Sequence, residues 1–125
     1  MKLEIKHLAP YLPYVITCTA NDKSFEDHPL MGLIEYNDTA LFDFENGEQD
    51  YSLKDFKPLL LPLSKLDFSL STPFTPYTQS LMDADGGIEE NIMSCPYEDM
   101  LLMLERHYDV FGLIPAGLAI DKTTI

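Results

Sequence analysis

The sequence predicts a small α+β domain, either a strongly bent antiparallel β-sheet or an SH3-like barrel, with a C-terminal helix packed on it. Two observations predict this class. Short β-branched and aromatic runs separated by turn residues fill much of the first half of the 125-residue chain. One amphipathic stretch near the C-terminus has the spacing of a helix. The length predicts a single domain over residues 1–125, and 46% hydrophobic residues can build its core.

The first half of the chain is expected to form four strands. They are Val15–Thr19, Leu30–Tyr36, Ala40–Glu45 and Gln49–Leu53. The first is β-branched at four of its five positions, which favours extended backbone. Asn37–Asp38 and Asn46–Gly47 are the expected two-residue turns, because Asn, Asp and Gly tolerate positive φ angles.

These turns predict a register for the last three strands. A turn at Asn37–Asp38 places Leu33 opposite Phe42, and a turn at Asn46–Gly47 places Phe42 opposite Tyr51. Successive side chains of a strand point to opposite faces. One face is therefore expected to be a core face that carries Met31, Leu33, Phe42, Phe44 and Tyr51.

The other face of this hairpin is predicted to be acidic. In the same register Glu45 opposes Glu48 and Asp43 opposes Asp50, so like charges lie directly across the ladder, which is destabilising. Water and salt, a basic partner or a bound hard cation such as Ca²⁺ or Mg²⁺ would offset this repulsion. The four carboxylates are the candidate partner-binding or cation-binding residues, and we assign no cofactor.

The second half of the chain is less regular. Residues 57–66 are apolar, but Pro58 and Pro62 favour an edge strand followed by a short helix. Residues 69–79 are rich in Ser, Thr and Pro and are expected to form a loop. A helix is expected over residues 96–107. Its predicted apolar stripe consists of Tyr97, Leu101, Leu104, Tyr108 and Phe111.

The charge of the chain limits its partners. Acidic residues outnumber basic ones 21 to 8, which gives a formal charge of −13. Direct binding to nucleic acid or to an anionic membrane is therefore not expected, because phosphate contacts need positive side chains. Residues 1–7 mix charges where a signal peptide would have an apolar core, and the two cysteines form no disulfide framework. A cytoplasmic location with reduced cysteines is expected.

No motif in the sequence identifies a reaction. The glycine-rich segment 112–117 lacks the Lys and the spacing of a P-loop, and the turn at 83–87 fails as a calcium loop. The three histidines lack metal-site spacing. Cys95, at the expected start of the helix, is the better nucleophile candidate of the two cysteines, against its interpretation as a small helix-flanking residue.

Three stretches of the chain carry a resemblance to known proteins. They are His7–Tyr14, Lys57–Ser64 and His107–Asp121. Together they resemble a group of small proteins of phages and prophages in Bacteroidetes-type bacteria. The segment 68–94 shows no such likeness and is interpreted as a possible loop-rich insertion. The resemblance implies a bacterial cytoplasmic setting and a mobile-element origin. That group has no established activity, so no residue role transfers from it.

Three functions follow as hypotheses. The first is a non-enzymatic phage or prophage accessory protein that binds another protein. The second is an acidic mimic of nucleic acid that inhibits a DNA-handling enzyme, which would require carboxylates in two rows along one face. The third is a metal-dependent hydrolase that uses the hairpin carboxylates.

Overall fold

The computed structural model describes residues 2–65, 75, 76, 78, 80 and 87–124. The described helices and strands are α1 (Ile5–Leu8), β1 (Thr17–Ala20), β2 (His28–Pro29), β3 (Gly32–Ile34), β4 (Thr39–Phe44), β5 (Gly47–Ser52), β6 (Phe56–Leu60), α3 (Gly87–Asn91), α4 (Tyr97–Glu105) and β7 (Ile120–Asp121). Short 3₁₀ helices join them: η1 (Ala9–Tyr14), η2 (Glu35–Asn37), η3 (Leu53–Asp55), η4 (Leu63–Lys65), η5 (Ile92–Ser94) and η6 (Lys122–Thr124).

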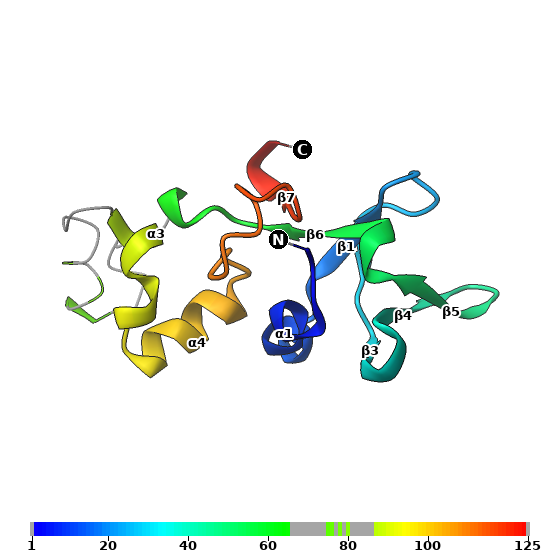
Figure 1. Ribbon diagram of the computed structural model, residues 1–125, viewed down its shortest axis with the longest axis horizontal. Helices are drawn as coiled ribbons and strands as arrows, with labels where there is room; N and C mark the ends of the chain where they lie inside the picture. Colours follow the sequence, from blue (N-terminus) through cyan, green and yellow to red (C-terminus); the bar gives the residue numbers. More distant parts are fainter. Residues whose placement is uncertain (1, 66–74, 77, 79, 81–86, 125) are drawn as a thin grey trace.

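The strands form two open sheets. One has the order β2-β1-β6-β7 and is mixed, because β6 and β7 are parallel. The other is the antiparallel meander β3-β4-β5. The α+β class is thus confirmed, but the two sheets do not close into a barrel within the described residues. The meander lies at one end of the long axis and helices α3 and α4 at the other (Figure 1).

Strand β6 is central, whereas the prolines predicted an edge strand. The Asn21 N–H donates to the Asp55 carbonyl at 2.9 Å. Bonded and non-bonded pairs alternate along an antiparallel ladder, so Cys18 and Pro58 form a non-hydrogen-bonded pair. The nitrogen of Pro58 therefore faces away from β1, and the pairing of β6 with β7 begins only at Leu59. The missing N–H costs no ladder bond, which is why a central strand tolerates the proline.

The register of the meander differs from the predicted one by two residues. Leu33 opposes Ala40, and Phe42 opposes Gln49. Instead of a two-residue turn at Asn37–Asp38, η2 and an Asp38 with φ 52° connect β3 to β4. Because the shift is even, most predicted faces are preserved, but Met31 lies outside the core with 55% exposure.

An aromatic cluster joins the two sheets. Phe25, from the loop between β1 and β2, packs against Phe42 and Tyr51 with ring centroids 4.7 and 4.8 Å apart. Phe56 of β6 meets Phe42 edge-on at 5.2 Å. Phe25, Phe42 and Phe56 are all buried. Aromatic pairs in such tilted and edge-on arrangements stabilise a fold beyond what the burial of their surface area contributes. This cluster therefore holds the meander against the mixed sheet.

Helix α4 is confirmed, with Pro96 preceding its first residue rather than occupying it. Its C-terminus is closed by two hydrogen bonds, from His107 N–H to the Leu104 carbonyl and from Tyr108 N–H to the Met103 carbonyl. The helix packs beside η1 rather than across a sheet face. Tyr97 of the predicted stripe is 78% exposed, whereas Asp99 on α4 is fully buried.

The N-terminal segment is tied to the C-terminal part of the chain. The buried Tyr11 hydroxyl donates to the Tyr108 carbonyl and accepts from the Val110 N–H at 3.1 Å. The imidazole Nε2 of His107 lies 2.8 Å from the Tyr14 carbonyl. A carbonyl can only accept, so Nε2 carries the proton. Both contacts join residues more than ninety positions apart in sequence.

Most of the predicted insertion lies outside the described residues. At its C-terminal end, the described residues 87–94 form α3 and η5. None of the described helices combines the length and the apolar character needed to cross a membrane.

Candidate functional site

The acidic face of the β4–β5 hairpin exists in a modified form. Asp43 opposes Glu48, while Asp50 opposes Leu41 and Glu45 lies in the turn. The predicted pairs Glu45–Glu48 and Asp43–Asp50 are therefore wrong. The even shift of register still leaves Asp43, Glu48 and Asp50 on the side of the sheet opposite the aromatic cluster, and all four carboxylate residues are exposed.

The Asp43–Glu48 pair is closely spaced. The Leu53 N–H donates to the Asp38 carbonyl at 3.2 Å, which makes these two a hydrogen-bonded pair at the end of the ladder. Alternation along the ladder then makes Asp43–Glu48 a non-hydrogen-bonded pair. Side chains approach most closely in pairs of this type, so the hairpin holds two like charges where their repulsion is strongest.

The same alternation defines the free edge of β5. Residues 47, 49 and 51 direct their backbone groups toward β4. The N–H and C=O groups of Glu48, Asp50 and Ser52 face away from β4, where the described residues add no further strand. β5 is the longest edge strand of the two described sheets. The free edge therefore offers paired backbone donors and acceptors beside acidic side chains.

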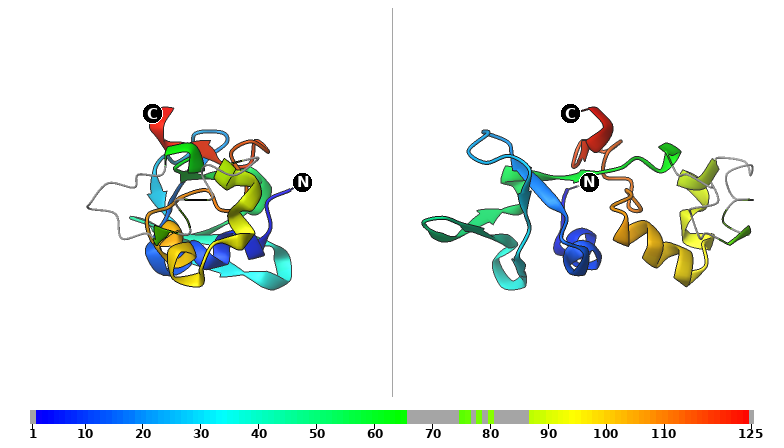
Figure 2. Two further views of the ribbon diagram at one scale, coloured as in Figure 1. Left: turned by 90° about the vertical axis from the view of Figure 1, so that its left-hand side faces the viewer. Right: turned by 180° about the vertical axis from the view of Figure 1, so that it is seen from behind.

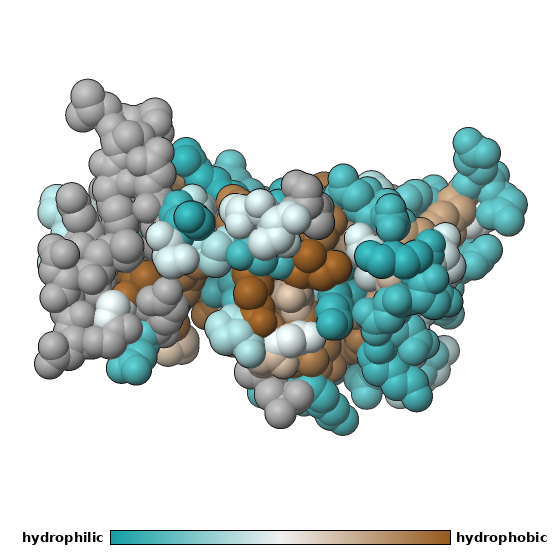
Figure 3. Space-filling model, turned by 90° about the horizontal axis from the view of Figure 1, so that it is seen from above, coloured by the Kyte–Doolittle hydropathy of each residue, from teal (hydrophilic) through white to brown (hydrophobic). Residues whose placement is uncertain are grey.

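No ion pair among the described residues compensates the negative charge of the hairpin. Eight acidic residues and no Lys or Arg occur between Lys23 and Lys54. In the part of the chain that the structure describes, ion pairs join Lys6 to Glu4 and Lys23 to Glu26, and neither involves the hairpin. In Figure 3 the end of the molecule that carries β4 and β5 is mostly hydrophilic.

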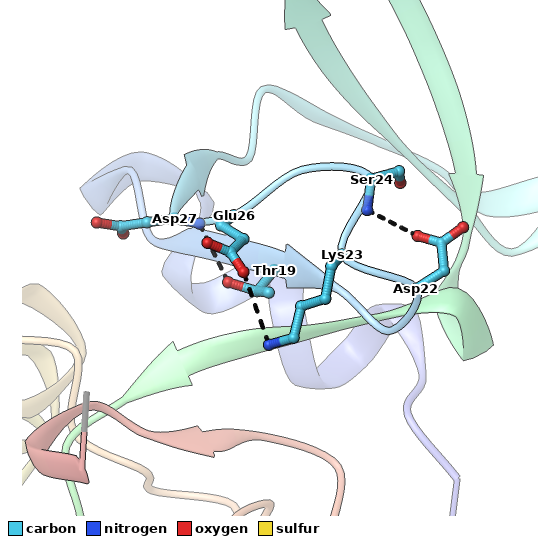
Figure 4. Close-up of polar contacts among 6 residues, drawn as sticks. All are labelled: Thr19, Asp22, Lys23, Ser24, Glu26 and Asp27. Carbon is cyan, nitrogen blue, oxygen red and sulfur yellow. Dashed lines mark hydrogen bonds and ion pairs between the residues drawn. The ribbon is translucent and has the colours of Figure 1, made fainter.

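The loop between β1 and β2 lies at the same end of the molecule, as the view from behind in Figure 2 shows. Local contacts fix its shape (Figure 4): Asp22 accepts from the Ser24 N–H at 2.9 Å, and the Thr19 hydroxyl accepts from the Asp27 N–H at 3.0 Å. Lys23 lies 3.9 Å from Glu26. The one lysine of this loop is thus directed to its own loop and not to the hairpin.

The inner face holds the hairpin rigidly. His28 stacks on Phe44 with ring centroids 4.5 Å apart, and its Nε2 lies 2.6 Å from the Asp43 carbonyl. Phe44 also packs on Phe25 and Tyr51. Binding residues carried on a well-packed strand pair keep their geometry better than residues on a loop. The acidic side chains are therefore presented on a fixed support.

Two of the predicted roles for the acidic face are not favoured by this geometry. Among the described residues, no three His, Cys, Asp or Glu side chains gather as a metal site would require. The nucleic-acid-mimic hypothesis requires two rows of carboxylates along one face, whereas β4 and β5 form one opposed acidic pair, Asp43–Glu48. The exposed carboxylates of the hairpin can instead each accept a cationic side chain of a partner that lies along the free edge of β5.

The cysteines are not activated. Burial raises the pKa of both the Cys18 and the Cys95 thiol, and a high pKa disfavours the nucleophilic thiolate. Both thiols are free, and Cys18 is buried. The structure therefore gives Cys95 the character of a helix-flanking residue, the alternative weighed for it from sequence.

The sequence analysis missed two buried carboxylates. Asp99 accepts hydrogen bonds from the N–H and hydroxyl of Thr75 and from the Thr78 hydroxyl. Asp109 accepts from the N–H groups of Leu113 and Ile114 at 2.7 and 2.8 Å. Both tie local backbone or neighbouring threonines together, and no spacing in the sequence signals such a role.

A cavity lined by three lysines was also missed. Lys2, Lys54 and Lys57 line a hollow of about 470 Å³. They come from the N-terminal segment, η3 and β6, so only the folded chain brings them together. A second hollow of about 470 Å³ lies between η4, η5 and the segment after α4, and its lining is mostly apolar, with Ser64 and Asp109 as the polar side chains.

Comparison with known proteins adds no assignment. No family model, no curated protein and no solved structure matches the chain.

Proposed function

We propose that the protein acts without catalysis, by binding a basic, extended segment of a partner protein along the free edge of β5. The observation that carries the proposal is the coincidence of an unpaired strand edge with acidic side chains, at Glu48 and Asp50, that no described cation neutralises. The phage or prophage setting stays a prediction that rests on the resemblance alone.

The mode of binding is strand addition. An incoming strand would bond the outward N–H and C=O groups of Glu48, Asp50 and Ser52, which supplies affinity largely independent of sequence. Side chains of an extended segment alternate between faces, so every second residue would lie over the acidic face of the hairpin. Lys or Arg at those positions would relieve the repulsion between Asp43 and Glu48, and this charge match supplies specificity.

The acidic side chains also disfavour the pairing of β5 with a second copy of the chain. An exposed strand edge can pair with the same edge of another copy of the chain. Two copies of β5 would bring Glu48 and Asp50 against each other, which like-charge repulsion disfavours. The edge is thus closed to self-association and open to a basic strand.

A designed peptide tests the proposal. The probe is a fluorescent peptide of about eight residues, long enough for one strand, in which lysine alternates with threonine. Its control has the same sequence with a methyl group on the backbone nitrogen of every lysine. In the proposed pairing the lysine N–H groups face β5, so the control keeps the charge but cannot donate to this edge. Anisotropy titrations at about 0.01 M and about 1 M salt compare Debye lengths of about 30 Å and about 3 Å. We expect the parent peptide to bind more tightly than its N-methylated control at low salt, and we expect its affinity to fall at high salt.

Two substitutions of Asp50 separate the contribution of its charge to binding from the contribution of its backbone N–H. Asp50→Asn removes the charge and keeps the outward N–H, whereas Asp50→Pro removes both, without breaking a bond to β4. Strand addition predicts that Asp50→Pro weakens binding more than Asp50→Asn does. Glu98→Gln, an exposed change on α4, is the control and should bind like the parent protein. Circular dichroism checks that each variant keeps the fold.

Two results would overturn the proposal. Equal binding of the parent peptide and its N-methylated control would mean simple charge attraction rather than strand addition. Equal weakening by Asp50→Asn and Glu98→Gln would mean that the overall charge of the chain, and not the hairpin, attracts the peptide.

A further inference from the structure

A cavity opens beside the corner where β5 passes through η3 into β6. It has a volume of about 470 Å³. Its walls come from residues 2–4, residue 21 after β1, residues 37 and 38 at the end of η2, residues 52–54, 56 and 57, and residue 118. Pockets that enclose small molecules usually measure about 300–1,000 Å³, so the cavity is large enough to hold one.

The charge of the cavity opposes that of the chain. Lys2, Lys54 and Lys57 are three of only eight basic residues in a chain with 21 acidic ones. None of the three has a carboxylate partner within 4.0 Å in the described part of the chain, whereas Lys6 and Lys23 do.

The two carboxylates that line the cavity do not cancel this charge. The Glu4 carboxylate is already 3.5 Å from Lys6, and Asp38 forms no ion pair among the described residues. The lining therefore holds three lysines and two carboxylates, of which one already has a lysine partner outside the cavity, and its net charge is positive.

Apolar side chains form the base of the cavity. Leu3, Leu53 and Phe56 line it and are themselves 7%, 4% and 1% exposed. These well-packed residues offer a dry surface to the body of a ligand, while the lysine stems can lie along it with their ammonium groups toward solvent. The cavity thus combines an apolar base with a cationic rim.

The backbone beneath the rim is fixed. The side-chain amide of Asn21 donates to the Lys54 carbonyl at 2.9 Å, and the Asn21 N–H donates to the Asp55 carbonyl at the same distance. Lys57 lies on β6, paired with Thr19 of β1. A site whose backbone is already ordered loses less entropy when a ligand binds.

We propose that this cavity binds a small molecule that carries one anionic group, a carboxylate or a phosphate, on an apolar body. The anionic group lies among Lys2, Lys54 and Lys57, and the apolar body lies on Leu3, Leu53 and Phe56. The cavity adjoins the free edge of β5 at Ser52, but its lysines take no part in the proposed binding of a basic strand, so each proposal is tested by its own probes and variants.

Three aromatic probes test the proposal and distinguish the two anions. Benzoate carries a carboxylate, phenyl phosphate carries a phosphate, and benzamide is the neutral control. Each is titrated into ¹⁵N-labelled protein, and amide chemical shifts report both the affinity and the place of binding. We expect saturable shifts with one or both anions at Asn21, Leu53 and Lys54, and no saturation with benzamide over the same range.

Charge variants give the second readout. Lys54→Gln and Lys57→Gln should each weaken anion binding about two- to fivefold, the range expected of a partly exposed charge contact. Lys23→Gln makes the same change at a lysine that is exposed and paired with Glu26, and it should leave the affinity unchanged. Salt should weaken binding to the parent protein.

The proposal is overturned by any of three results. The first is that neither anion gives saturable shifts up to about 10 mM, which is a weak limit for a specific small-molecule site. The second is that benzamide binds as tightly as the anions. The third is that the Lys23, Lys54 and Lys57 variants lose affinity equally. Saturation by benzoate alone identifies a carboxylate site, and saturation by phenyl phosphate alone identifies a phosphate site.

Discussion

Replacing Asp43 by Asn should stabilise the protein. Asp43 opposes Glu48 in a non-hydrogen-bonded pair, and like charges so placed destabilise a sheet by about 0.2–1 kcal/mol. Both side chains are exposed, so we take about 0.5 kcal/mol at low salt. For a chain of 125 residues the entropy of unfolding is about 0.26 kcal/mol per degree, which converts the gain to a rise in melting temperature of about 2 °C.

A double-mutant cycle isolates the repulsion. Asp43→Asn, Glu48→Gln and the double variant are compared by urea denaturation at low and high salt. Either single change removes the repulsion, so the second should add little, and the gain should disappear as salt screens the charges. Asp50→Asn is the matched control, because Asp50 has the same chemistry on the same face but opposes Leu41. It should stabilise the protein less than Asp43→Asn does.

The assigned register would be refuted by a different pattern. If Asp50→Asn stabilised the protein more than Asp43→Asn, then Asp50 would have a closer acidic neighbour than Glu48 is to Asp43. Full additivity of Asp43→Asn and Glu48→Gln at low salt would show that the two carboxylates do not interact.

Three further predictions concern the fold. Phe25→Ala should destabilise the protein by about 3–5 kcal/mol in urea denaturation, because Phe25 is buried against Phe42, Phe44 and Tyr51; a loss below about 1 kcal/mol would contradict this packing. Val15 has a φ of 53° and is 54% exposed, so Val15→Gly should raise stability by about 0.5–1 kcal/mol, and a thermal melt that shows a loss would count against the strained backbone. Burial raises the pKa of Asp109 above its ordinary value of 3.8. The folded state therefore binds the proton of the Asp109 carboxyl group more tightly than the unfolded state does. The stability that the protonated carboxyl contributes is complete below pH 3.8 and is lost as the pH rises through the pKa of the folded state. An NMR titration that gives Asp109 a pKa at or below 3.8 would reject this prediction.

The sequence was sufficient to predict the faces of the meander but not its pairing. Alternation of apolar and polar residues determines which side chains share a face, and any even shift of register satisfies it equally. The choice between registers depended on the turns. Asn46–Gly47 was correctly identified as a hairpin signal, but the turn is formed by Glu45 and Asn46, and Gly47, with a φ of 118°, begins the returning strand. A glycine marks where positive φ is needed, not which turn position it fills.

The remaining differences come from contacts between distant segments. Pro58 argues for an edge strand only if every N–H of the strand must be bonded, and the limited length of β7 removes that condition. Lys2, Lys54 and Lys57 are ordinary surface lysines in sequence and share a cavity only after the N-terminal segment, η3 and β6 meet. The acidic hairpin residues could be found because they are neighbours along the chain.

The two sheets also differ in when they can form during synthesis. The meander β3-β4-β5 joins strands that follow one another directly, so it can pair as soon as residue 52 has emerged from the ribosome. The mixed sheet is completed later. Its strands β2, β1 and β6 can pair once residue 60 has emerged, but β6 also pairs in parallel with residues 120 and 121, and Tyr11 bonds to Tyr108 and Val110. We expect pulse-labelled hydrogen exchange during refolding to protect the amides of β4 before those of β6, and the reverse order would contradict this sequence of events. Until the last strand arrives, the nascent chain would expose the apolar side of β6 beside an already formed acidic hairpin, whose charge keeps neighbouring nascent chains apart.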